Sequence, residues 1–135
     1  MRRVFFISCM LLLACSGKSH NEQSARAMFD EFNHHNWKGV ASYYTEQAEF
    51  LDPAFGTDYV TRSREQTASK YAEMEKMFPN IVDDVRSIYA VDDKIIVEFV
   101  SSGSSGDSIK FKLPICTILT FKDGLITRDA TYYDQ

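Results

Sequence analysis

The chain has 135 residues, a length that suits one domain with a hydrophobic core of its own. Hydrophobic residues make up 44% and charged residues 25%, as in an ordinary globular protein, and the formal net charge is −4. An acidic balance argues against nucleic acid as a partner, because proteins that bind nucleic acid present a basic face. We therefore expect a folded domain whose partner is not nucleic acid.

The first 14 residues differ in composition from the rest of the chain. Arg2 and Arg3 precede an apolar run, Val4–Ala14, which has 11 residues. A helix that spans a bilayer needs about 20 residues, so this run is too short to cross as a helix. A basic start followed by a short apolar core is typical of an export signal.

The segment Leu12-Leu13-Ala14-Cys15 resembles the bacterial lipoprotein box. The resemblance implies that residues 1–14 are a cleaved signal peptide, that Cys15 is acylated, and that residues 15–21 are the lipidated cysteine and a polar tether. Two or more acyl chains hold a protein stably on a membrane. The implied location is the bacterial cell envelope, and Ser16 resembles the pattern for an outer membrane facing the periplasm. An ordinary signal peptide with a chance cysteine is the alternative.

Cysteine and histidine positions bear on disulfides and metals. If Cys9 leaves with the signal and Cys15 carries lipid, Cys116 is the one cysteine of the folded domain, and no intrachain disulfide can form. His34 and His35 are adjacent, but no cysteine or acidic cluster with a known ligand spacing lies nearby. We therefore expect no metal and no cofactor.

Three helices are predicted in the first 77 residues. The first begins within Asn21–Ser24, and the second covers Trp37–Tyr44. The third covers Arg64–Met77 and starts with a capping box, in which Ser63 and Gln66 satisfy free backbone amides. Each helix shows apolar residues at three- and four-residue spacing, so each has one face to bury.

Strands dominate the remainder of the chain. A short strand is predicted over Glu46–Pro53 and is followed by a loop that runs to about Thr61. After the third helix we expect strands over Val82–Ala90 and Lys94–Ser101, a flexible loop over Ser102–Asp107, and a final hairpin. Helices first and an antiparallel meander last predict an α+β fold, with three helices packed on a strongly curved antiparallel sheet.

The final hairpin turns at Asp123-Gly124, a strong hairpin signal between apolar runs. Alternation places one apolar face on the first strand and an acid with two hydroxyls on one face of the second. If that side is concave, the hairpin builds an apolar cup with polar groups, as in a small-molecule pocket. A plain twisted sheet with its polar side in water is the alternative. The residues concerned are Ile109, Phe111, Leu113, Ile115, Thr117, Leu119 and Phe121, then Leu125, Thr127, Asp129, Thr131 and Tyr133.

Residues 22–135 resemble the SnoaL-like branch of the nuclear transport factor 2-like superfamily. The matching segments are Asn36-Trp37, Tyr44 with Ala48 to Asp52-Pro53, Phe78-Pro79-Asn80, Asp123-Gly124-Leu125-Ile126 and Tyr132-Tyr133-Asp134. The resemblance implies a cone-shaped α+β barrel with a deep pocket between sheet and helices. Members of this superfamily frequently dimerise through the outer face of the sheet, so the resemblance also implies a possible homodimer.

Known catalytic sets of this superfamily are incomplete in the chain. Asp52-Pro53 matches the proton-shuttling acid of the ketosteroid isomerases, but the positions of their two oxyanion donors fall on Met28 and Cys116. Losing even one such donor costs on the order of 100- to 1000-fold in rate. We therefore do not expect steroid isomerase activity.

The epoxide hydrolases of the superfamily share Leu113-Pro114 with the chain. Their Asp-Arg-Asp set falls on Thr131, Phe99 and Ser101, so all three catalytic side chains are replaced. A hydroxyl can bind a ligand, but unaided it cannot serve as acid or base at neutral pH.

Two functions of different classes remain. The first is a membrane-tethered domain that holds a small apolar molecule, or an envelope partner, in a conical pocket. The second is a SnoaL-like enzyme of isomerase, cyclase or hydrolase type that uses Asp52 and/or Asp129 as general acid or base. A structural interpretation of Asp52 is a turn acid before proline, and one of Asp129 is a rim residue paired with Arg128 or a lysine. The expected ligand wall is Val97, Phe99, Ser101, Leu113, Ile115, Thr117, Leu119 and Thr131.

Overall fold

The structure is a computed structural model, and it describes residues 16–134, with side chains from residue 20. The predicted signal peptide, residues 1–14, and the predicted lipidation site, Cys15, lie outside the described residues. Within residues 16–134, no helix combines the length and apolar character needed to cross a bilayer.

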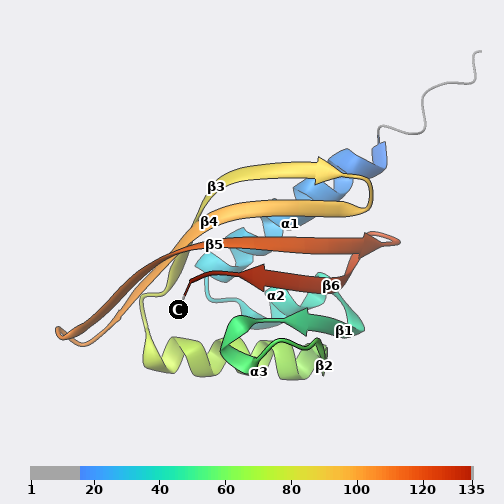
Figure 1. The fold of residues 1–135 in the computed structure, drawn as a ribbon. Helices are drawn as coiled ribbons and strands as arrows, with labels where there is room; N and C mark the ends of the chain where they lie inside the picture. The colour runs from blue at the N-terminus through green and yellow to red at the C-terminus, as the bar shows by residue number, and fades with distance from the viewer. Residues whose placement is uncertain (1–15, 135) are drawn as a thin grey trace, which may run out of the picture.

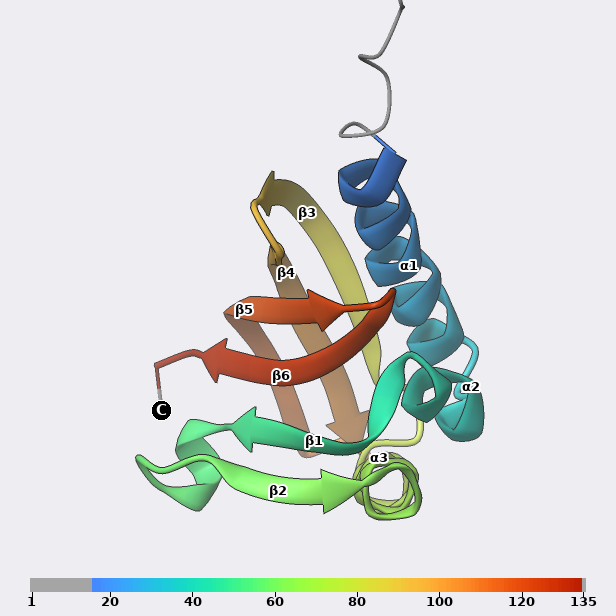
Figure 2. The same cartoon turned by 90° about the vertical axis from the view of Figure 1, so that its right-hand side faces the viewer.

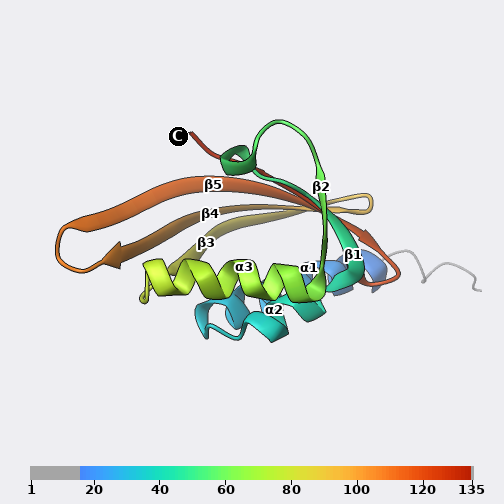
Figure 3. The same ribbon diagram turned by 90° about the horizontal axis from the view of Figure 1, so that it is seen from below.

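Three α-helices and a six-stranded sheet form the domain, as the α+β prediction requires (Figure 1). The strand order is β2-β1-β6-β5-β4-β3. Seen from below, the helices lie on one side of the sheet (Figure 3). The sheet curves, so that β3 runs along α1 while β1 and β2 approach α3 (Figure 2). The elements are α1 (Ser16–Asn33), α2 (Trp37–Ser42), β1 (Tyr44–Leu51), a 3-10 turn (Pro53–Phe55), β2 (Val60–Ser63), α3 (Arg64–Met77), β3 (Val82–Val91), β4 (Lys94–Ser105), β5 (Ile109–Lys122) and β6 (Leu125–Tyr132).

The sheet is antiparallel except at one pair. β1 runs parallel to β6, where Phe50 lies beside Asp129. The prediction of an all-antiparallel sheet was wrong at this pair, because β1 and β6 come from opposite ends of the domain and no tight turn fixes their relative direction. The pairing brings the end of β1, and Asp52 just after it, toward the polar side of β6.

Two helices match their predictions closely. α3 covers Arg64–Met77 as predicted, and its capping box is complete: the Gln66 amide donates to Ser63 Oγ at 3.1 Å, and the Ser63 amide donates to Gln66 Oε1 at 2.9 Å. α2 begins at the predicted Trp37 and is capped by Asn36, which accepts from the Gly39 amide at 3.1 Å. α2 ends at Ser42 because Tyr44 already belongs to β1.

The start of α1 differs from its prediction. The helix begins at Ser16, whereas the sequence placed the start within Asn21–Ser24 and treated the preceding residues as a tether. No proline interrupts this polar stretch, so a helix stabilised by the buried apolar residues further along can continue back to Ser16. Further along, Ala25, Met28 and Phe29 are buried, as the predicted stripe requires.

Two connections contain more regular structure than predicted. The loop after Asp52 includes a 3-10 turn and the short strand β2, which pairs with β1. β2 has four residues, too few to show a period. β4 continues to Ser105 and β5 begins at Ile109, so most of the predicted flexible loop belongs to a long hairpin. Ile109, predicted on the buried side, is 59% exposed near the tip of this hairpin.

The last hairpin turns as predicted but contains an extra residue. Asp123 and Gly124 have φ angles of 51° and 79°, the positive values of a tight hairpin turn. Phe121 pairs with Ile126 while Thr120 pairs with Arg128, which leaves Thr127 as a β-bulge. The bulge reverses the alternation, so Leu125 and Thr127 do not share the inner face with Asp129 as predicted. Ile126 is fully buried in their place.

The hydrophobic core fills the space between the inner face of the sheet and the helices. At one end of the sheet it is closed by fully or nearly fully buried side chains of β1, β4, β5 and β6. These are Tyr44, Ile95, Val97, Leu119, Phe121 and Ile126. Packing is therefore dense at one end of the sheet, and the open space lies toward the other end.

Candidate functional site

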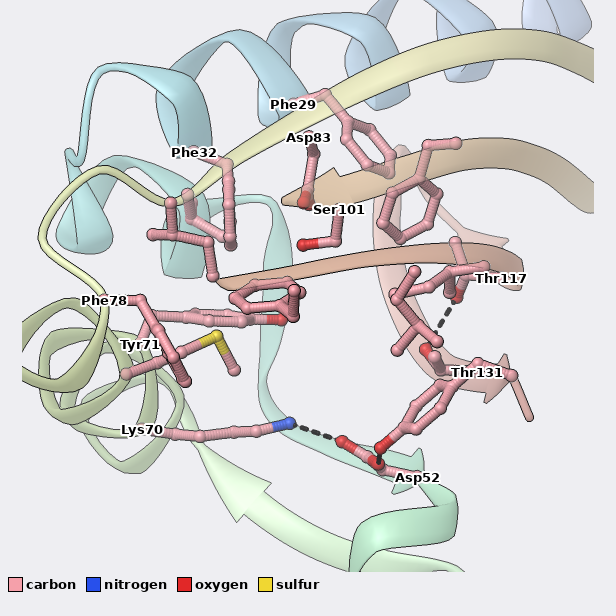
Figure 4. A pocket seen from close by; sticks show the side chains of 18 of the residues that line it. Phe29, Phe32, Asp52, Lys70, Tyr71, Phe78, Asp83, Ser101, Thr117 and Thr131 are labelled. Atoms are coloured by element: carbon pink, nitrogen blue, oxygen red, sulfur yellow. Dashed lines mark hydrogen bonds and ion pairs between the residues drawn. The ribbon is translucent and has the colours of Figure 1, made fainter. Parts of the chain in front are cut away.

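A cavity of about 600 Å³ lies between the inner face of β3–β6 and helices α1 and α3 (Figure 4). Most of its wall is apolar, and the polar side chains enter at a few separate points. A concave, mostly apolar site of this size suits a small organic molecule. The lining residues are Met28, Phe29, Phe32, Val40, Asp52, Lys70, Tyr71, Met74, Met77, Phe78, Ile81, Asp83, Phe99, Ser101, Phe111, Lys112, Leu113, Ile115, Thr117, Asp129, Thr131 and Tyr133.

The structure brings most of the residues predicted for the ligand wall to this cavity. On the wall are Phe99, Ser101, Leu113, Ile115, Thr117 and Thr131, together with both predicted acids. Val97 and Leu119 share the inner face, but both are fully buried in the core. The concave side of the hairpin is therefore the side with the acid and the hydroxyls, although its alternation breaks at Thr127.

Asp129 is buried on β6 and surrounded by hydroxyl donors. Its carboxylate accepts from Tyr44 Oη at 2.7 Å, from Thr117 Oγ1 at 2.6 Å and from Thr131 Oγ1 at 3.1 Å. It is not the rim residue paired with Arg128 that the structural interpretation described, because Arg128 pairs with Glu49 at 2.6 Å. Three donors satisfy this carboxylate within the protein.

Two tyrosines extend the Asp129 network toward the helices. Burial, together with the charge of Asp129, raises the pKa of Tyr44 well above its usual value, and the same two causes raise the pKa of Tyr71. The hydroxyls of Tyr71 and Tyr44 also interact with each other. Both phenols are therefore neutral donors at ordinary pH, and only Tyr71 reaches the cavity wall.

Asp52 caps a backbone turn and also lines the cavity. As the turn interpretation predicts, its Oδ1 accepts from the Ala54 amide at 3.0 Å and caps the 3-10 turn. Tyr133 Oη donates to the same oxygen at 2.7 Å, and Lys70 Nζ lies 2.9 Å from Oδ2. Burial raises the pKa of Asp52, but the ion pair with Lys70 and these hydrogen bonds outweigh it, so the pKa lies below its usual value. Asp52 is therefore a stable carboxylate and a weak base.

A third cavity acid, Asp83, was missed by the sequence reasoning. Asp83 is on β3 opposite Ser101 of β4, and only 7% of it is exposed. Ile88 pairs with Val97 and faces inward. Simple alternation counted back from Ile88 would therefore place Asp84 inside and Asp83 outside. Arg86 is an extra residue in the β3–β4 register, and this bulge reverses the alternation so that Asp83 faces the cavity.

The Asp83 carboxyl has unusual electrostatics. Burial raises its pKa to about 6, and interaction with the Ser101 hydroxyl offsets only part of that effect. Among the side chains of residues 20–134, its Oδ1 is the single buried oxygen or nitrogen without a hydrogen-bond partner. Figure 4 shows Asp83 beside Ser101 and Phe29. A carboxylate of this kind is free to interact with a ligand.

The described part of the chain offers no grouping of three or more histidine, cysteine or acidic side chains able to hold a metal ion. His35 links elements instead: Nδ1 lies 3.0 Å from Glu75 Oε1, and Nε2 lies 2.8 Å from the Ile81 carbonyl oxygen. The lone cysteine among the described residues, Cys116, is partly exposed opposite Glu98 on the outer face.

Comparison with known families gives the cavity its context. Residues 25–129 match the family described as the SnoaL-like domain. The chain belongs to the SnoaL-like domain family. The match covers all of the residues that line the cavity except Thr131 and Tyr133. No curated protein matches this SnoaL-like chain in sequence.

Solved structures with the same fold include an epoxide hydrolase and proteins described only by their fold. A hypothetical protein with a ketosteroid isomerase-like fold from Catenulispora acidiphila, in complex with trimethylamine, has 23% identity and a TM-score of 0.74 over 83% of this chain and 85% of that one. A cystatin-fold protein from Novosphingobium aromaticivorans has 17% identity and a TM-score of 0.73 over 83% and 97%. An LEH-like epoxide hydrolase from M. tuberculosis has 15% identity and a TM-score of 0.74 over 87% and 85%. At these identities the likeness establishes the fold alone.

Proposed function

We propose that this SnoaL-like domain binds a small, largely apolar molecule in its conical cavity. The observation that carries the proposal is the cavity itself: about 600 Å³ of space, walled mainly by aromatic and aliphatic side chains, with polar groups at separate points. The Catenulispora neighbour holds a small molecule, trimethylamine, which supports a small ligand for this fold. An envelope protein partner is the other occupant to consider, but a deep apolar cavity suits a small molecule better.

A pair of matched substitutions tests the proposal. Ile115→Trp fills the cavity from β5, whereas Ile118→Trp places the same change on the opposite face of the same strand. Native mass spectrometry of the gently purified full chain should find a bound molecule in wild type and Ile118→Trp, and none in Ile115→Trp. Undiminished ligand in Ile115→Trp, or an empty wild type, would contradict the proposal.

An enzyme that uses Asp52 and/or Asp129 as general acid or base is the second candidate. It is favoured by the position of both acids on one cavity wall. Against it, Asp52 is held by Lys70 and Asp129 by three hydroxyls, so neither is a free base. Product formation from the co-purified molecule, present in wild type and lost in Asp52→Asn or Asp129→Asn, would favour the enzyme over the binding domain.

We also propose that the domain is held on a bacterial envelope membrane through acylated Cys15. The support is the segment Leu12-Leu13-Ala14-Cys15, which follows a short apolar run. Cells grown with labelled palmitate should label the wild-type protein and Cys9→Ser but not Cys15→Ser. Equal labelling of all three proteins, or none in wild type, would contradict lipidation at Cys15.

A homodimer through the outer face of the sheet completes the proposal. It is supported by exposed apolar side chains on that face, including Tyr89 at 52% and Tyr132 at 48%. Analytical ultracentrifugation should detect a dimer that Tyr89→Arg dissociates. Glu73→Arg, which changes an exposed side chain of α3 on the helix side of the sheet, should leave the dimer intact.

A further inference from the structure

Asp83 is fixed in place by its backbone. The Asn33 side chain at the end of α1 donates from Nδ2 to the Asp83 carbonyl oxygen at 2.9 Å and accepts from the Asp83 amide at 2.8 Å. Neither bond uses the Asp83 carboxyl. The β-bulge at Arg86 and this pair of hydrogen bonds therefore hold the carboxyl at the cavity wall while leaving one of its oxygens available.

The three carboxylates of the cavity differ in what balances their charge. Asp52 has Lys70 at 2.9 Å, and Asp129 accepts from three hydroxyls. Asp83 has only the Ser101 hydroxyl, and no cationic side chain among residues 20–134 lies within ion-pair distance of it. The other cavity cation, Lys112, is on an exposed stretch of β5. A buried carboxylate without a partner is costly, so a cation supplied from outside would be stabilised here.

Aromatic rings make up much of the cavity wall. Phe29 packs against Phe99 with ring centroids 4.9 Å apart, and Phe78 packs against Phe111 at 4.8 Å. Phe32 and Tyr71 form a third pair at 5.5 Å. Ring faces attract organic cations, and apolar walls exclude the water that would otherwise solvate a charge. A metal ion would need several converging ligands, and the described residues hold no group of three or more histidine, cysteine or acidic side chains that could bind one.

We propose that the cavity binds a protonated organic amine, whose N–H group donates to the free Oδ1 of Asp83 and whose hydrocarbon part packs against the aromatic wall. This inference rests on the proposed function, since it names the chemical class of the molecule in the same cavity. An N–H donor satisfies the one buried side-chain oxygen without a partner among the described residues, and the positive charge balances a carboxylate that has no cation beside it.

Binding of the amine depends on pH through Asp83. Its pKa of about 6 makes it a carboxylate above that pH and a neutral acid below it, where its attraction for a cation is lost. Other titratable groups face the cavity from the elements packed around it, and the test must separate them from Asp83. They are Lys70 and Tyr71 of α3, Asp52 after β1, Lys112 of β5, Asp129 of β6 and Tyr133 at the chain end.

The test compares a cation with its neutral isostere. N,N-dimethylbenzylamine and isobutylbenzene have nearly the same shape, and only the amine carries a proton and a charge. Dissociation constants for both are measured by NMR titration of the full chain, at about pH 8 and about pH 5, in wild type, Asp83→Asn and Asp84→Asn. Asp84→Asn is the matched control, because Asp84 is the next residue on β3 and pairs with Arg86 at 2.8 Å on the exposed side.

The expected result is a preference for the amine of about tenfold or more at the higher pH, in wild type and Asp84→Asn alike. The ratio of the two dissociation constants should fall to about one in Asp83→Asn at both pH values. In wild type the ratio should shrink at the lower pH. Equal binding of both compounds by wild type would overturn the amine inference and leave small-molecule binding standing. A preference unchanged in Asp83→Asn would overturn the role of Asp83. Failure of wild type to bind either compound would overturn the inference and count against the cavity as a binding site as well.

Discussion

The Asn33 side chain and the Asp83 backbone exchange two hydrogen bonds, at 2.9 and 2.8 Å, and so join the end of α1 to the start of β3. These residues are 50 positions apart in the chain, and both lie beside the cavity. The contact fixes the helix layer relative to the edge of the sheet at the point where Asp83 enters the wall.

Replacing Asn33 with alanine should loosen this junction. Two partly buried hydrogen bonds to the backbone are lost together, and we expect a fall of about 2 kcal/mol in the free energy of unfolding, measured by urea titration. Asn80→Ala is the comparison, because Asn80 makes a similar exchange with Ser104 at an exposed site and should cost less. Equal costs for the two variants would show that burial of the Asn33 contact contributes nothing.

Replacing Asp83 with asparagine should stabilise the protein above pH 6. Burial raises the pKa of Asp83 from 3.8 to about 6, so between these values the folded state holds a proton that the unfolded state has lost. Stability from this group is therefore greatest at low pH and is lost as the pH rises through about 6. Removing the charge should raise the free energy of unfolding by on the order of 2 kcal/mol at pH 8, with little change below about pH 4.

The control for that measurement is Asp84→Asn, which removes an equal charge from the exposed side of the same strand. We expect its pH profile of stability, followed by chemical unfolding from about pH 4 to 8, to stay close to wild type. A profile for Asp83→Asn that also stays parallel to wild type would mean that Asp83 is not the group that titrates.

Replacing Tyr44 with phenylalanine should destabilise the domain without changing its shape. The variant removes the hydroxyl that donates to Asp129 at 2.7 Å and leaves a buried carboxylate with one donor fewer. The expected loss is about 1–3 kcal/mol in the free energy of unfolding. Tyr43→Phe makes the same change at the neighbouring residue, which is only partly buried, and should have a smaller effect. Equal losses would argue against the importance of the Asp129 network.

The ion pair between Asp52 and Lys70 should stabilise the protein only while Asp52 is ionised. The pKa of Asp52 is lower in the folded state, so its contribution is present above its usual value and is lost as the pH falls through the folded value. A double-mutant cycle with Asp52→Asn and Lys70→Met should give a coupling of about 1–3 kcal/mol at pH 7, because both side chains are largely buried. The coupling should vanish in strong acid, and a coupling that persists there would contradict the assignment.

The parts of the fold that follow from local chemistry could be predicted. Ser63 and Gln66 form a capping box within four consecutive residues, and Asp123-Gly124 forms a two-residue turn. The third helix and the turn of the last hairpin were therefore predicted correctly. The prediction that Thr117 and Thr131 face inward was also correct, because both lie in the regular part of the hairpin.

The features that depend on distant strands could not be predicted. The parallel direction of β1 against β6, and the short strand β2, are fixed only when the sheet assembles. Val97 and Leu119 lie on the inner face of the sheet as predicted, but in the core and not on the cavity wall. No pattern in the sequence indicates that the helices cover that end of the sheet and leave the other end open. Asp83 was missed because a bulge is invisible to a rule of simple alternation.

The bulge at Arg86 means that strand length helps to decide the chemistry of the cavity. If Arg86 were paired in regular alternation instead of forming the bulge, Asp84 would face inward and Asp83 outward, and an insertion on another wall strand that is not taken up as a bulge would exchange its facing residues in the same way. Insertions and deletions of single residues can therefore diversify ligand preference in this fold without replacing any side chain. For the same reason, an alignment that places gaps only in loops will compare inward residues of one relative with outward residues of another.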